Sequence, residues 1–176
     1  MSSIQSCELP QAALLAKYLH AGAYADCYVT EVARPVSHAE YVEAFYSTPV
    51  FRIERLLLAW LVSKPSTDVQ ARELACGTLD TFAAWGVEGR SADQLLLSDF
   101  QGRTKSWLMS AASEAGGPAS TRLYFGSAVV PVVSRKSGKA RMGFAFRALL
   151  GLHKLYSRAL LRAASSRLAR SRHTET

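Results

Sequence analysis

Residues 142–170, MGFAFRALLGLHKLYSRALLRAASSRLAR, carry the pattern that decides the predicted fold. Apolar residues recur there at alternating spacings of three and four, which is the period of an amphipathic helix. The pattern predicts a long C-terminal helix from Met142 to about Arg170. Its inner stripe is expected to contain Leu149, Leu152, Tyr156, Ala159 and Ala163, and its solvent side Arg147, Lys154, Arg158 and Arg162.

The sequence before this helix is typical of strands. Four segments, at residues 82–88, 94–100, 104–110 and 121–130, are strand-like, and Gln101-Gly102 and Gly116-Gly117-Pro118 are plausible turns between them. They predict a meander of about four antiparallel strands. In the third segment both faces carry apolar residues, so the pattern does not tell which face is buried.

The N-terminal third predicts helices around one strand. A short helix is expected at residues 10–20, a strand at 24–33, and a helix after Ser37, which has Glu40 three residues later as a capping box. Helices at 50–62 and 68–75 follow. The chain is therefore predicted to be α+β, with N-terminal helices and an antiparallel sheet packed on the C-terminal helix, in one domain over residues 1–165. Residues 166–176 are expected to be a basic, disordered tail.

The charge is concentrated at the C-terminal end. Residues 1–133 contain 10 Lys+Arg and 13 Asp+Glu, whereas residues 134–176 contain 11 Lys+Arg and one acid, Glu175. Three interpretations stay open: a solvated outer helix face, a contact with an anionic membrane surface, or nucleic-acid binding. The solvated face is favoured. Nucleic acid is the least favoured partner, because no recognised DNA- or RNA-binding motif accompanies the charges.

Several classes of protein lack support in the sequence. A hydrophobic fraction of 49% with 20% charged residues argues against disorder. No apolar run approaches the ~20 residues of a membrane span, and no secretory signal is visible. The three cysteines form no CxxC and no zinc-ligand spacing, which predicts ordinary reduced thiols, no metal and a cytoplasmic location. Phosphate-loop, HExxH and GxSxG motifs are missing, so no cofactor is expected.

Four short motifs resemble those of a bacterial protein family of unknown function. They are GAYAD at 22–26, AFYSTP at 44–49, Asp99-Phe100, and LLGLHKL at 149–155. The chain is also similar, in its order of elements, to the helix-grip proteins, in which a curved antiparallel sheet wraps a long C-terminal helix. These include plant pathogenesis-related allergens, START-type lipid-transfer domains and small polyketide cyclases. The chain departs from that plan by one extra helix, at residues 68–75, and by a shorter meander.

The resemblance implies a cavity between sheet and C-terminal helix for a hydrophobic small molecule or lipid. His153 is the main candidate in it, because it lies on or beside the inner stripe, where an imidazole can act as a general base or bind a ligand carbonyl. Tyr156 is one turn further, and Tyr124 and Trp107 are candidates to project from the sheet towards it. Arg55 is a candidate anchor that could pair with Asp26. Each of these residues also has an ordinary structural interpretation.

Two functions besides ligand binding are carried forward. A cofactor-independent enzyme of the cyclase or dehydratase type would use His153 as its acid/base group, and it would need a second polar group near the substrate. A peripheral membrane protein would dock through the basic C-terminal helix. The sequence leaves open whether the protein is an enzyme.

Overall fold

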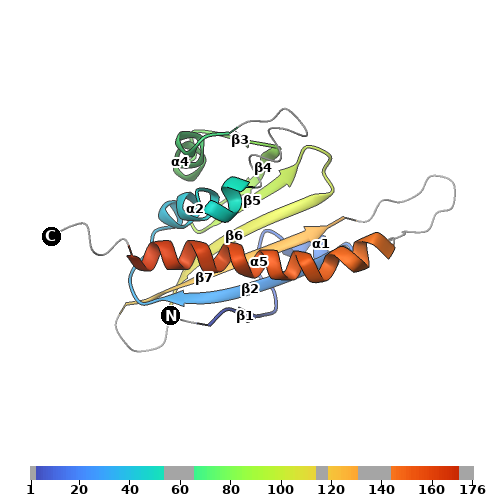
Figure 1. Ribbon diagram of the computed structural model, residues 1–176, viewed down its shortest axis with the longest axis horizontal. Helices are drawn as coiled ribbons and strands as arrows, with labels where there is room; N and C mark the ends of the chain where they lie inside the picture. Colours follow the sequence, from blue (N-terminus) through green and yellow to red (C-terminus); the bar gives the residue numbers. More distant parts are fainter. Residues whose placement is uncertain (1–2, 54–65, 114–118, 131–143, 171–176) are drawn as a thin grey trace.

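The computed structural model describes residues 3–53, 66–113, 119–130 and 144–170, with side chains for all of them except residues 144–152. The architecture is α+β, as predicted: an open, seven-stranded antiparallel sheet, a long C-terminal helix and several further helices (Figure 1).

The sheet has the order β1-β2-β7-β6-β5-β4-β3. From β3 to β7 the strands follow one another along the chain, as a meander does. β2 then lies against β7, so the first long strand pairs with the last one, and the blue and orange strands are neighbours in Figure 1. The bounds are β1 Gln5–Ser6, β2 Tyr24–Val32, β3 Thr81–Phe82, β4 Trp85–Arg90, β5 Gln94–Asp99, β6 Thr104–Ala112 and β7 Thr121–Val129.

Local sequence sets the ends of two helices. In α2 (His38–Tyr46) the Ser37 side chain accepts from the Glu40 backbone N–H and Glu40 accepts in return, so the predicted capping box is confirmed. Thr67 and Gln70 form the same box at α4 (Asp68–Cys76). Gly77, with φ of 79°, ends α4 in the left-handed conformation that glycine adopts without strain.

Other predicted boundaries are corrected. The first helix is shorter than predicted, since α1 spans only Ala16–His20. The predicted strand at 82–88 is divided, because Ala83 has φ of 53° and turns the chain between β3 and β4. Residues 49–53 are helical, but the rest of the predicted helix at 50–62 and the predicted turn at 116–118 lie outside the described residues.

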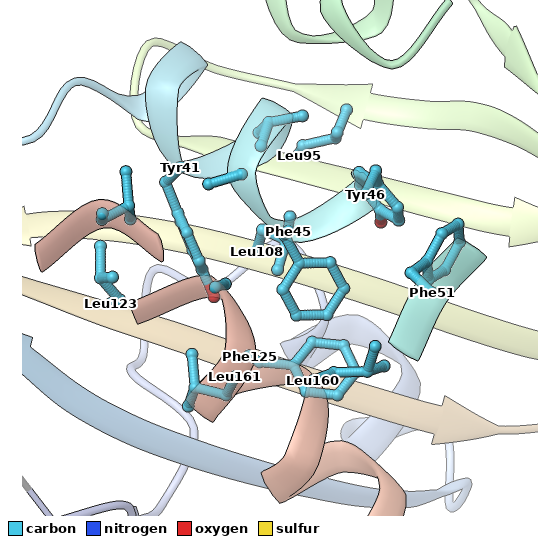
Figure 2. Packing of buried hydrophobic residues seen from close by; sticks show 14 of the residues in the cluster. Tyr41, Phe45, Tyr46, Phe51, Leu95, Leu108, Leu123, Phe125, Leu160 and Leu161 are labelled. Atoms are coloured by element: carbon cyan, nitrogen blue, oxygen red, sulfur yellow. The ribbon is translucent and has the colours of Figure 1, made fainter. Parts of the chain in front are cut away.

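One face of the sheet holds the main core. α2, α4 and α5 (Phe144–Arg170) lie on the side seen in Figure 1, and Figure 2 shows aromatic rings of α2 meeting the sheet and α5. The Phe45 ring lies 4.8 Å from that of Phe125 and 5.1 Å from that of Tyr46, centroid to centroid. Edge-to-face and tilted pairs of this kind add to the free energy of burial.

The opposite face holds a second, smaller core. Trp107 and its neighbours are covered there by the N-terminal segment and α1. Gln94 ties the layers together: its Oε1 accepts from the Leu14 backbone N–H and from Trp107 Nε1–H, both at 2.9 Å, and its Nε2 donates to the Ala12 carbonyl at 3.0 Å. Both faces of β6 are therefore buried. This explains why apolar residues occur on both faces of this strand and why the sequence did not tell which face is buried.

Over residues 153–170, the inner face of α5 differs by one position from the predicted stripe; the side chains of Leu149 and Leu152 lie outside the described part. Tyr156, Ala159 and Ala163 are only half-buried. The fully buried positions in the described part of the helix are Ser157, Leu160, Leu161, Ala164 and Leu168.

The C-terminal end of α5 packs against the main core. Leu168 packs in the main core, so the predicted tail boundary at residue 165 falls inside the helix; residues 171–176 lie outside the described residues.

Among the helices that the structure describes, none is both long and apolar enough to cross a bilayer.

Gly126 in β7 marks a close approach between the layers. A Cβ at this position would lie 2.9 Å from Trp107 Cε3, 3.0 Å from Leu15 Cδ2 and 3.1 Å from the Asp26 carbonyl oxygen. We expect Gly126→Ala to lower the free energy of unfolding by about 1–3 kcal/mol, because a ring and a backbone must shift. Urea denaturation measures this. Gly86→Ala, where a Cβ would meet no atom within 4 Å, is the control; an equal loss in both variants would contradict the packing argument.

Candidate functional site

Three polar side chains meet where α5 crosses the β2–β7 pair. Strand register places Asp26 directly opposite Ser127, and α5 brings His153 to both. Ser127 Oγ lies 2.6 Å from Asp26 Oδ1 and 2.7 Å from His153 Nε2, and His153 Nε2 lies 3.7 Å from Asp26 Oδ2. The Asp26 side chain is 8% exposed and that of His153 30%. A hydrogen-bonded chain thus runs from the sheet to the helix.

The donors in this chain follow from proton counting. An ionised carboxylate only accepts, so the single hydroxyl proton of Ser127 goes to Asp26. The serine oxygen then accepts from His153 Nε2–H. In the neutral imidazole this assignment leaves Nδ1 as the acceptor nitrogen, available for a ligand donor or a proton.

Asp26 is the unusual member of the cluster. Its Oδ2 is buried, and no donor among the described residues lies within hydrogen-bond distance of that oxygen, although the Tyr28 hydroxyl interacts with the same carboxylate. The Asp26 charge affects the neighbouring tyrosines. Burial raises the pKa of Tyr28 to about 12; the negative charge of Asp26, Tyr24 and a hydrogen bond to Asp26 add to the shift, and Arg158 opposes it. Burial and Asp26 also raise the pKa of Tyr24. A buried acceptor without a donor is costly, and its presence calls for an explanation.

A groove of about 510 Å³ opens beside this cluster. It lies between the N-terminal segment and α5, along the edge of β2. Its wall combines apolar side chains, two thiols, two acids and two cations, the cations coming from α5. The lining residues include Leu9, Leu19, Tyr24, Tyr28, Asp26, Cys7, Cys27, Glu8, Lys154 and Arg158.

The structure divides the predicted ligand-binding set. His153 and Tyr156 lie on α5, with Tyr156 half-buried against the main core. Trp107 and Tyr124 do not project towards them, because strand alternation points both to the opposite face, where their rings lie 6.4 Å apart. That part of the prediction is wrong. Arg55, and with it the predicted pairing to Asp26, lies outside the described residues.

Sequence reasoning missed Ser127 altogether. The residue begins an otherwise apolar stretch, SAVVPVV at 127–133, and carries no local signal. Only the register of β2 against β7 shows that it stands opposite Asp26. Asp26 itself was noted, but with Arg55 as its partner.

The outward face of α5 is basic, as predicted. Lys154, Arg158 and Arg162 are exposed one turn apart, and Leu155 beside them is 66% exposed. Lys154 and Arg158 also reach the rim of the groove.

A second charged cluster lies on the opposite face of the sheet and joins α1 to the strands. The Glu88 carboxylate accepts from Lys105 Nζ at 2.8 Å, from Lys17 Nζ at 2.5 Å and from the Tyr18 hydroxyl. Its members hold α1 in place, which is a structural role. Over the described residues, no group of three or more His, Cys, Asp or Glu side chains could hold a metal ion.

No protein-family model matches the chain, and no curated protein matches it. The resemblance to helix-grip proteins therefore stays a prediction.

Glu88 gives a prediction on acid stability. Burial tends to raise its pKa, but hydrogen bonds from Lys105, Lys17 and Tyr18 outweigh this and hold the pKa at about 2. Because the folded-state pKa is below the unfolded one, the carboxylate stabilises the fold above about pH 4.5, and this contribution is lost as the pH falls towards 2. We expect Glu88→Gln to be less stable than wild type at pH 7 and equally stable near pH 2, in urea titrations across this range. The exposed Glu73→Gln is the control; a constant difference for Glu88→Gln at every pH would contradict the assignment.

Proposed function

We propose that this protein binds a small hydrophobic molecule or lipid that carries a hydrogen-bonding group, between the sheet and α5. The observation that carries the proposal is Asp26, which lines a partly apolar groove and is hydrogen-bonded through Ser127 to His153 behind it. One oxygen of this carboxylate is buried without a donor within hydrogen-bond distance. Pockets for small molecules combine mostly apolar walls with a few convergent polar groups.

The polar contacts define what the ligand needs. Asp26 lines the groove, and a ligand hydroxyl would supply the donor that its Oδ2 lacks. His153 does not line the groove itself, but it is 30% exposed next to the lining residue Lys154, and a ligand that reaches past this rim would find an acceptor at its Nδ1. The surfaces of Leu9, Leu19 and Tyr24 suit an aliphatic or aromatic body next to that group. Hydrophobic alcohols and phenols meet these requirements.

Two further features support a ligand of lipid type. Lys154 and Arg158 stand at the groove rim, where an anionic or polar head group would meet them. The element order of strand, helices, meander and long helix also agrees with the helix-grip resemblance, in which the ligand lies between sheet and helix. We therefore propose that the chain has the helix-grip plan.

Binding is tested with a fluorescent hydrophobic phenol, 2-naphthol, in direct titration, because it carries the hydroxyl donor and the aromatic body that the groove requires. We expect His153→Ala to raise the Kd about tenfold, the equivalent of one lost hydrogen bond, and to leave Tm nearly unchanged. His20→Ala, an exposed histidine on α1, is the matched control and should bind as wild type. Native mass spectrometry of freshly purified protein then identifies any co-purified molecule. Unchanged affinity with a large loss of Tm would assign His153 to structure alone.

A second candidate is an acid/base enzyme of the cyclase or dehydratase type. The specific observation in its favour is the orientation of His153, since Ser127 and Asp26 fix the protonated nitrogen and leave the other one basic. General bases in enzymes are often oriented by such hydrogen bonds.

A binding protein leaves the bound molecule unchanged, whereas an enzyme converts it. Wild-type protein is incubated with the molecule found by mass spectrometry, and the mixture is followed by liquid chromatography and mass spectrometry. An enzyme of this type would convert the molecule to an isomer or remove water, with mass loss of about 18 Da. We expect His153→Ala to slow conversion by about 10²-fold or more, since general acid/base groups contribute that much. Ser127→Ala should slow it less, because Ser127 only orients the imidazole. An unchanged molecule bound by wild type supports the binding protein and rejects the enzyme.

A further inference from the structure

Cys7 and Cys27 lie directly opposite each other at the end of β1. The antiparallel register pairs Gln5 with Val29 and Ser6 with Tyr28, and it continues to the two cysteines, where Cys7 N–H donates to the Cys27 carbonyl at 3.0 Å. Their sulfur atoms are 3.2 Å apart. Opposed residues on paired strands have separations that a disulfide can bridge, with about 1 Å of further approach between the sulfurs.

The two thiols differ in burial and in the direction of their pKa shifts. Cys7 is half-buried, whereas Cys27 is 2% exposed, and both residues line the groove beside α5. The hydrogen bond from the Cys27 thiol lowers the pKa of Cys7, against the opposing effect of partial burial. The contact with Cys7, together with burial, raises the pKa of Cys27. Cys7 is therefore the more reactive nucleophile, and Cys27 is held beside it as its thiol.

We propose that Cys7 and Cys27 form a peroxide-reactive dithiol site that closes to an intramolecular disulfide. The Cys7 thiolate attacks hydrogen peroxide; an S–O bond forms, the O–O bond breaks, and hydroxide leaves. Cys27 gives up its proton and attacks the Cys7 sulfur; the S–S bond forms, the S–O bond breaks, and water leaves. In total, two thiols and one peroxide give one disulfide and two waters, so sulfur is oxidised and peroxide reduced.

The disulfide would fix the N-terminal segment to the sheet. β1 is a two-residue edge strand, held to the body by its short ladder with β2. A covalent link closes a loop between residues 7 and 27 and reduces the entropy of the unfolded chain. We expect the oxidised protein to melt about 5–10 °C higher than the reduced protein.

The experiment uses the full chain with Cys76→Ser, because Cys76 is exposed and would otherwise cross-link chains. One equivalent of hydrogen peroxide is added to the reduced, folded protein, and remaining thiols are then alkylated in denaturant. We expect a mass loss of 2 Da, no alkylation, a linked peptide containing Cys7 and Cys27, and full reversal by dithiothreitol. These readouts involve no ligand, so the result does not depend on the proposed binding function.

Two matched variants separate the roles of the cysteines. With Cys27→Ser added, Cys7 should be trapped as a sulfenic acid by dimedone, and no intramolecular disulfide should form. With Cys7→Ser added instead, Cys27 should react at least tenfold more slowly. If these variants fail to fold, peptide mapping of the Cys76→Ser protein still decides. Two free thiols after peroxide treatment, or disulfides only between chains, would overturn the proposal.

Discussion

The pairing of β2 with β7 is the constraint on which the rest of the structure depends. Every residue of β2, from Tyr24 to Val32, stands opposite a residue of β7, although the two strands are far apart in the sequence. This register turns a meander into a seven-stranded sheet and gives α5 a continuous surface to cover. It also makes the candidate site, because Asp26 and Ser127 are register partners. A slip of β2 by one residue would move Asp26 to the other face of the sheet, away from Ser127.

The same strand pair serves both layers of the protein. Successive side chains of a strand point to opposite faces, so Asp26 belongs to the cluster under α5 and Cys27 to the core under α1. Opposite them, Ser127 completes the cluster, while Gly126 leaves room for the Trp107 ring. The proposed ligand contact and the proposed dithiol are thus one residue apart in the chain, and both border the same groove at the edge of β2.

Local features were predictable from the sequence, and features that depend on register were not. The Ser37 capping box, β2 and the period of α5 were predicted because each depends on residues a few positions apart. His153 was found because it lies on that period. Ser127 was missed, since a serine in a strand gains its role only from what stands opposite. Trp107 was placed on the wrong face because nothing local reveals that residues 10–20 cover the back of the sheet.

The distance between β2 and β7 has a consequence for how the protein is made. β2 ends at residue 32 and β7 begins at residue 121, so about 90 further residues must be added before the pair can form, which takes on the order of 5–20 s at usual rates of synthesis. Throughout that interval the first long strand leaves the ribosome without its main partner. An unpaired strand edge can join a neighbouring chain. Each newly made copy can therefore aggregate through β2 until β7 is made, and the order of the strands sets the length of this interval.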